Sequence, residues 1–128
     1  MTDKPQNEIP DFSNFPVFNP TNMEKLRFQT RNKPELLKEI IDSFIEESYE
    51  IVEEMKSYIA TNNEEMLSRS VHTLKGLSGT IGASRFYQLL SFIDACHKQE
   101  NFTYKEELYT LFDSNLKQLS QYFDNEGF

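Results

Sequence analysis

The residues best suited to chemistry form one run in the middle of the chain, His72-Thr-Leu-Lys75-Gly76, with a further glycine at Gly79. A helix turns by about 100° per residue, which places the apolar side chains of this segment opposite His72. Those apolar residues are Leu67, Val71, Leu74, Leu77 and Ile81. We therefore expect the imidazole of His72 to point away from the core, where a partner molecule can reach it.

Lys75, Gly76 and Gly79 lie on the same predicted face as His72. A glycine inside a helix costs about 1 kcal/mol relative to alanine, and on an exposed face its missing side chain leaves room for a partner. A cation three residues from an imidazole favours the neutral, nucleophilic ring and stabilises an anion attached to it. A neutral imidazole, open space and a nearby cation are together typical of a phosphoryl acceptor.

Ser68 and Arg69 lie on this face as well, and their position alone suggests that they contribute to partner docking. Ser78 falls on the apolar side and is expected to pack in the core. No Cys, serine–base pair or second His is positioned here for acyl transfer or metal binding, although the sequence leaves open whether distant carboxylates contribute to such chemistry.

The elements around this segment are expected to be helices. Four of the five prolines lie in the first twenty residues, which predicts an extended arm over residues 1–20. A short helix follows to about Thr30, opened by a capping box over residues 21–24. The spacing of apolar residues then predicts four longer helices. The first spans about residues 34–60, and the second runs from a cap at Asn62 to a left-handed stop at Gly82. The third begins at a cap at Ser84, and the fourth begins at a capping box at Thr103.

No alternating strand pattern occurs, and the connections between the long helices are short. The sequence therefore predicts an all-α fold, an antiparallel up-down-up-down four-helix bundle over residues 21–128 with a short N-terminal helix and an extended arm. On the helix over 34–60, the expected buried face consists of Leu37, Ile41, Phe44, Ile51, Met55 and Ile59.

Composition excludes several classes of function. The chain has 13 Lys and Arg against 21 Asp and Glu, a formal net charge of −8, which argues against nucleic acid or an anionic membrane as partner. A single cysteine, Cys96, and two histidines, His72 and His97, give no metal cluster, and we assign His97 no direct role. Neither a secretory signal nor a membrane span is recognisable, so we expect a cytoplasmic protein.

The run from His72 to Ala83 resembles the signature of histidine-containing phosphotransfer (HPt) domains of multistep phosphorelays. That signature is His-x-x-Lys-Gly, then a small residue two further on, and a closing Gly-Ala. Here it is His72-Thr-Leu-Lys75-Gly76-Leu-Ser78-Gly79-Thr-Ile-Gly82-Ala83. The resemblance extends over the predicted bundle and leaves out residues 1 to about 20.

The resemblance implies a phosphocarrier without an ATP-binding domain of its own. His72 would accept a phosphoryl group on Nε2 from a receiver-domain aspartate and pass it to another receiver aspartate. Lys75 would stabilise the phosphoryl oxygens, and Gly76 and Gly79 would give access. Of the expected docking residues Ser68, Arg69, Lys75 and Gly79, the first two are assigned from their position on the helix and not from the resemblance. The partners would be receiver domains of response regulators or hybrid kinases. The receiver would hold the Mg²⁺, this chain would bind no cofactor, and it would act as a monomer.

Two other functions remain open on the sequence. The chain could be the phosphoacceptor module of a larger kinase of the chemotaxis or hybrid type, or a helical adaptor that is not phosphorylated. The dimerising domain of a sensor kinase fits less well, because there an acidic residue usually follows the histidine, whereas Thr73 stands here.

Overall fold

The computed structural model describes residues 9–98 and 105–126, and in these residues it contains helices and no strand. The helices are α2 (Pro20–Gln29), α3 (Pro34–Ala60), α4 (Glu64–Ile81), α5 (Ser84–Lys98) and α6 (Lys105–Glu126). This confirms the all-α class, and the bounds of α3 agree with the expected 34–60.

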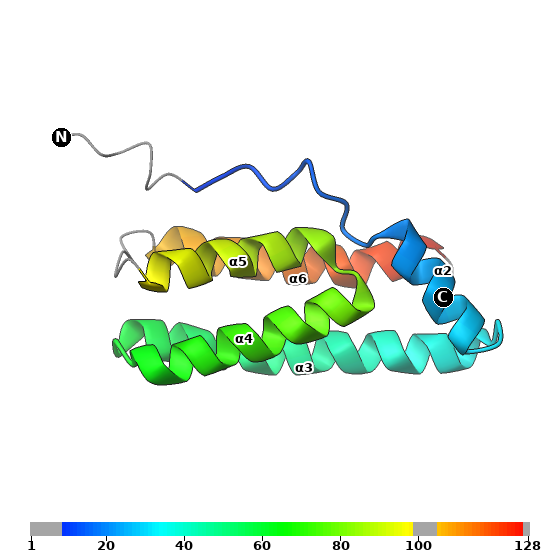
Figure 1. Ribbon diagram of the computed structural model, residues 1–128, viewed down its shortest axis with the longest axis horizontal. Helices are drawn as coiled ribbons and strands as arrows, with labels where there is room; N and C mark the ends of the chain where they lie inside the picture. The colour runs from blue at the N-terminus through cyan, green and yellow to red at the C-terminus, as the bar shows by residue number, and fades with distance from the viewer. Residues whose placement is uncertain (1–8, 99–104, 127–128) are drawn as a thin grey trace.

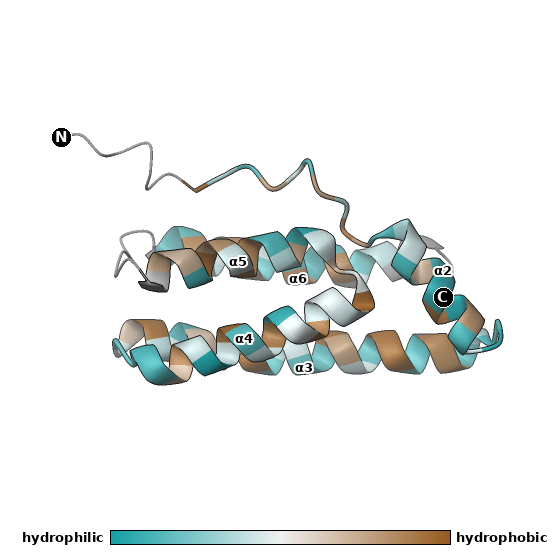
Figure 2. Ribbon diagram, in the orientation of Figure 1, coloured by the Kyte–Doolittle hydropathy of each residue, from teal (hydrophilic) through white to brown (hydrophobic). Residues whose placement is uncertain are grey.

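The four longer helices form an elongated bundle, with α2 across one end (Figure 1). Helix α3 contacts α4 and α6, α4 contacts α5, and α5 contacts α6, while α2 packs on α3 and α4. Hydrophobic residues recur between hydrophilic ones along each long helix (Figure 2). Their buried side chains meet in one core, which includes Met55, Leu74, Phe86, Leu90 and Phe112.

The buried face of α3 differs from the expected one in its middle. Ser48 and Val52 are fully buried there, whereas Ile51 is half-buried. With 3.6 residues per turn, the buried face passes from Phe44 through positions 48 and 52 to Met55. Ile51, seven residues after Phe44, therefore lies at the edge of that face. On α4, likewise, Ser78 is fully buried and Leu77 is half-buried.

Three helix starts differ from the expected ones by one or two residues. Asn19 caps α2 in place of Thr21, because its side-chain oxygen accepts hydrogen bonds from the backbone N–H groups of Thr21 (2.9 Å) and Asn22 (3.4 Å) and Pro20 follows as the first helical residue. Asn63 caps α4, by accepting from the N–H of Met66.

Asn62, the expected cap, instead has a positive φ of 56° in the turn before α4. Ser84 is the first residue of α5, and its hydroxyl donates a hydrogen bond to the carbonyl of Gly82. The expected cap at Thr103 lies outside the described residues.

Gly82 ends α4 in the left-handed conformation, with φ 85° and ψ 25°, as predicted. Its carbonyl accepts a hydrogen bond of 2.7 Å from the N–H of Asn19. A Cβ atom at position 82 would overlap the side chain of Asn22 in α2. The glycine therefore both turns the chain into α5 and lets α2 pack closely against that turn.

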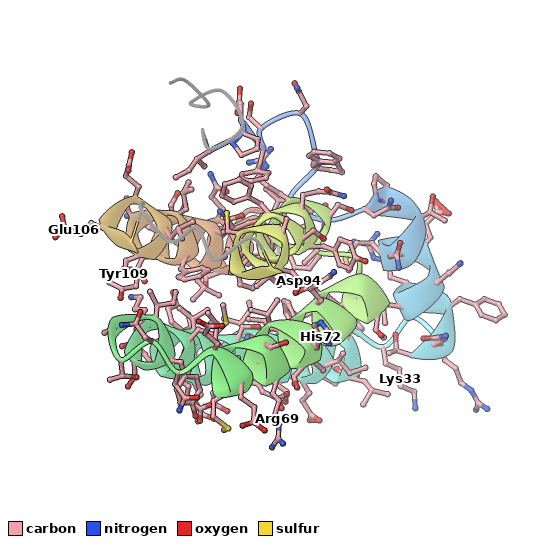
Figure 3. The ribbon with its side chains drawn as sticks, turned by 60° about the vertical axis from the view of Figure 1, so that its left-hand side comes forward. Lys33, Arg69, His72, Asp94, Glu106 and Tyr109 are labelled. Carbon is pink, nitrogen blue, oxygen red and sulfur yellow. The ribbon has the colours of Figure 1, made fainter. Side chains whose placement is uncertain are left out.

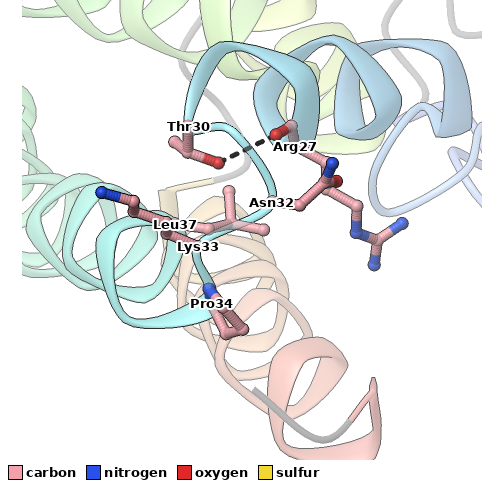
Figure 4. A pocket seen from close by; sticks show the side chains of 6 residues that line it. All are labelled: Arg27, Thr30, Asn32, Lys33, Pro34 and Leu37. Atoms are coloured by element: carbon pink, nitrogen blue, oxygen red, sulfur yellow. Dashed lines mark hydrogen bonds between the residues drawn. The ribbon is translucent and has the colours of Figure 1, made fainter.

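The turn between α2 and α3 encloses a small pocket of about 180 Å³ (Figure 4). The hydroxyl of Thr30 donates to the carbonyls of Leu26 (2.9 Å) and Arg27 (3.1 Å) and so closes the last turn of α2. Arg31 and Asn32 both have positive φ and reverse the chain into α3. The hydrogen bonds of Thr30 and the backbone conformations of Arg31 and Asn32 thus form the turn beside this pocket.

Part of the N-terminal arm packs on the bundle through aromatic side chains. Phe12 and Phe18 are buried. The ring of Phe12 meets Phe92 of α5 edge-on at 6.1 Å between centroids, and Phe18 lies 5.1 Å from Tyr122 of α6. The guanidinium of Arg85 fixes the intervening backbone, because it donates to the carbonyls of residues 13 and 15.

Candidate functional site

His72 lies on the exposed face of α4, as its helical phase predicts. Its side chain is 62% exposed, whereas Val71 and Leu74 beside it are buried in the bundle. The imidazole is thus carried on a rigid helix whose other face is locked in the core, and it is open to a macromolecular partner.

Asp94 of α5 is a charged neighbour of this imidazole that the sequence did not identify. Its Oδ1 lies 3.7 Å from Nε2 of His72, and its Oδ2 lies 4.0 Å from Nζ of Lys75. Figure 3 shows Asp94 on α5 close to His72 on α4. The side chain of Asp94 is only 10% exposed. The site therefore combines an imidazole, an ammonium group and a largely buried carboxylate.

A signal for Asp94 does exist in the sequence. It stands four residues after Leu90 and next to Ile93, both fully buried, so it is an acidic residue on the core-facing side of α5. A buried carboxylate needs a compensating partner, which marks the position as unusual. The identity of that partner depends on how α4 and α5 align, and this alignment cannot be read from helical phase alone.

Lys75 supplies the positive charge beside His72. Its side chain is 24% exposed, and its Nζ also lies 5.4 Å from the centre of the Tyr87 ring of α5. Asp94 and Tyr87 together hold the ammonium group on the α5 side of the imidazole. His72 and Lys75 thus both border the carboxylate of Asp94.

The two glycines of this face have different surroundings. A Cβ atom on Gly76 would meet nothing within 4 Å, so the fold itself does not require a glycine there. A Cβ atom on Gly79 would lie 3.6 Å from the ring of Tyr87, which is ordinary van der Waals contact. Open space beside His72 is therefore real at Gly76, while Gly79 borders an aromatic side chain.

The two remaining predicted docking residues are Arg69 and Ser68. Arg69 forms an ion pair of 3.2 Å with Glu65, and its side chain points away from Asp94 (Figure 3). Both partners of this pair are largely exposed. Ser68 is half-buried. The positive charge next to the imidazole comes from Lys75, and Arg69 lies at the edge of the face.

An apolar groove lies between α2, α3 and α4. It has a volume of about 450 Å³, and its apolar lining consists of Leu26, Ile40, Phe44, Leu77 and Ile81. Ile40 is 38% exposed, and Glu39 and Glu47 stand at the rim. Thr80, about two helical turns after His72, also lines the groove, so the groove reaches the C-terminal part of α4.

Other candidate chemistry is limited in the part of the chain that the structure describes. No three His, Cys, Asp or Glu side chains gather there in a way that could hold a metal ion, and no helix is long and apolar enough to cross a membrane. Cys96 is buried, and this burial raises the pKa of its thiol. The side chain of His97 lies outside the described residues.

Comparison with known proteins points to one family. The family model described as "Hpt domain" matches residues 39–122. Among solved structures, the chain resembles histidine-containing phosphotransfer protein B (HptB) from Pseudomonas aeruginosa PAO1, with a TM-score of 0.75 over 87% of this chain and 94% of that chain. The two sequences are 14% identical, so this likeness concerns the fold. No curated protein matches the sequence.

Proposed function

The chain belongs to the Hpt domain family, and from this premise we infer that it is a phosphorelay intermediate whose phosphoryl carrier is His72. In this proposal His72 accepts a phosphoryl group from the aspartate of one receiver domain and passes it to the aspartate of another. The observation that carries the assignment is the exposed imidazole of His72 on α4, with the Lys75 ammonium group within reach and open space at Gly76.

The proposed transfer is a displacement at phosphorus. The lone pair of Nε2 forms the N–P bond, while the bond between phosphorus and the receiver's aspartate oxygen breaks with its electron pair and restores the carboxylate. In this proposal the attacking tautomer carries its proton on Nδ1, and that proton is released to solvent once the N–P bond has formed, so the ring of phosphohistidine is uncharged. Transfer back to a receiver reverses both bond changes. Such transfer depends on positioning and charge, and a rigid helix presenting the imidazole meets the first need.

The charges are divided between the two proteins in this proposal. Lys75 is the cation of this chain that stabilises the phosphoryl oxygens, while the Mg²⁺ is held by the receiver. This chain supplies the nucleophile and one positive charge. We further propose that the carrier acts as a monomer.

We assign receiver docking to the His72 face and the apolar groove next to it. Ile40 and Leu77 offer apolar contact, Gly76 and Gly79 allow close approach, and Arg69 and Ser68 lie at the edge. An apolar centre with a polar rim is the usual composition of a protein interface.

For the fold, the short connections over 61–63 and 82–83 support the antiparallel up-down-up-down order of α3 to α6.

The test is transfer from a receiver domain carrying a labelled phosphoryl group on its aspartate. We expect the wild-type chain to take up label that is labile in acid and stable in base, as phosphohistidine is. His72→Gln should take up none, and His97→Gln, the matched control at the chain's other histidine, should behave as wild type. Absence of label on the wild-type chain, or equal label on His72→Gln, would refute the proposal.

A further inference from the structure

The carboxylate of Asp94 has no role in the transfer described so far, although it lies next to the reacting atom. It is largely buried, 3.7 Å from Nε2 of His72 and 4.0 Å from Nζ of Lys75. A buried negative charge is costly, and here it faces the position where a second anion would be formed. Resting on the proposed function, we propose that Asp94 is a positioning residue that holds Lys75 in the free protein and disfavours phosphohistidine.

In the unphosphorylated protein the charges of the site balance. Asp94 carries one negative charge and Lys75 one positive charge, and Tyr87 supports the ammonium group from the side at 5.4 Å. This arrangement holds the ammonium group of Lys75 against Asp94, and the contact has to weaken before the ammonium group can serve a phosphoryl group on His72.

In the phosphorylated protein the balance is lost. A phosphoryl group brings between one and two negative charges at neutral pH. Its oxygens on Nε2 would come close to Asp94, whose Oδ1 is only 3.7 Å from that nitrogen. Lys75 would then be shared between two anions, and its contact with Asp94 would weaken as it turns to the phosphoryl oxygens. Both effects raise the free energy of phosphohistidine relative to free histidine.

The consequence is a carrier that releases its phosphoryl group readily. Repulsion from Asp94 shifts the equilibrium away from His72 and toward a receiver aspartate, while Lys75 keeps the phosphorylated state accessible. Replacing Asp94 by a neutral residue of the same shape removes the repulsion and leaves Lys75 free to serve the phosphoryl group alone. Asp94→Asn should therefore retain phosphate on His72 more strongly than the wild-type chain.

The experiment uses phosphoramidate as the donor, so that no receiver is needed. Its N–P bond breaks as ammonia leaves, and the phosphoryl group moves to Nε2. At one fixed donor concentration, phosphorylated His72 is measured by ³¹P NMR at steady state, free His72 is the remainder of the known total protein concentration, and the ratio of the two is compared. We expect Asp94→Asn, and also Asp94→Ala, to raise this ratio by about three- to tenfold. The effect is no larger because solvent around the exposed imidazole screens the repulsion between Asp94 and the phosphoryl group.

The matched control is Glu65→Gln. Glu65 is a carboxylate on the same helix as His72, but it is exposed and paired with Arg69, so its removal tests net charge without touching the site. We expect its ratio to equal that of the wild type. An unchanged ratio in both Asp94 variants, or an equal rise in Glu65→Gln, would overturn the inference. Failure of the wild-type chain to be phosphorylated at all would instead refute the proposed function.

A second measurement separates a shared lysine from a merely structural role of Asp94. Lys75→Met is made in the wild-type and in the Asp94→Asn background, and the loss in the ratio is compared. Because Lys75 must give up its contact with Asp94 only in the wild type, its removal should cost more in the Asp94→Asn background. Equal losses in the two backgrounds would show that Asp94 does not act through Lys75.

Discussion

Asp94 of α5 places its Oδ1 3.7 Å from Nε2 of His72 on α4, so this ring nitrogen faces a largely buried carboxylate. The pair connects two neighbouring helices. Lys75, one turn further along α4, lies 4.0 Å from the other oxygen of the same carboxylate. The site thus combines an imidazole with charges of both signs, and its behaviour depends on the balance between them.

Gly76→Ala should stabilise the protein by up to about 1 kcal/mol, because alanine is the better helix former and its methyl group would enter open space. The free energy of unfolding, measured by urea denaturation, checks this. A loss of stability would show that the surroundings of Gly76 are tighter than the structure has them.

Gly79→Glu should leave the fold intact and stop transfer from a receiver, since a long side chain would project into the docking face next to His72. Gly79→Ala is the matched control, because its methyl group only reaches the Tyr87 ring at ordinary contact distance. Circular dichroism reports the fold, and uptake of label from a phosphorylated receiver reports transfer. Normal transfer by a folded Gly79→Glu protein would argue against this docking face.

Ile40→Glu should weaken docking of the receiver by at least about fivefold, the effect of losing one apolar anchor of an interface. Labelling by phosphoramidate should be unaffected, because the small donor does not need the groove. Tyr49→Glu serves as control, since Tyr49 is also exposed on α3 but does not line the groove. If both variants transfer equally well, the groove is not the docking surface.

Gly82→Ala should destabilise the protein by at least about 2 kcal/mol, because a left-handed residue with a side chain is strained and its Cβ atom would overlap Asn22. The overlap can be separated from the strain in an Asn22→Gly background, where the same substitution should cost less. Equal costs in the two backgrounds would assign the whole effect to the backbone.

Lys56 links α3 to α6 through Asp113, at 2.8 Å, and it also contacts Glu53 at 3.1 Å. Burial alone would lower the pKa of Lys56, but the hydrogen bonds to these two carboxylates outweigh it and raise the pKa above its ordinary 10.5. The stabilisation is therefore complete below pH 10.5 and is lost as the pH rises through the raised value.

Lys56→Met should accordingly lower the free energy of unfolding by up to about 1 kcal/mol at pH 8, with a smaller difference at pH 11. Lys117→Met removes an exposed lysine of α6 and should change stability little at either pH. A difference between Lys56→Met and wild type that does not shrink in base would mean that the packing of the side chain matters and its charge does not.

Helical phase was sufficient to predict what a single helix decides. It placed His72 outside, Ser78 inside and the end of α4 at Gly82, because each of these depends on residues within a few turns. Helix starts were less accurate, since Asn62 and Asn63 are equally good caps by residue type. The expected cap at Thr21 was wrong because the Asn19-Pro20 pair begins the helix earlier.

Contacts between helices could not be predicted in the same way. Asp94 and Tyr87 reach the site because α5 packs on α4 in a particular alignment. The sequence of α4 alone does not determine this alignment. The same holds for Phe12 and Phe18 of the arm, whose apolar character was evident while their contacts on α5 and α6 were not.

The ring of Tyr87 borders both Lys75 and Gly79, and this double contact limits how the sequence can change. Alanine at position 79 fits beside the ring, and a longer residue there must direct its atoms beyond Cβ away from the ring. A smaller residue at 87 relaxes this limit but removes the aromatic support of the lysine. In an alignment of relatives that keep this packing, the two positions should therefore covary, and position 75 should vary least where position 87 is aromatic.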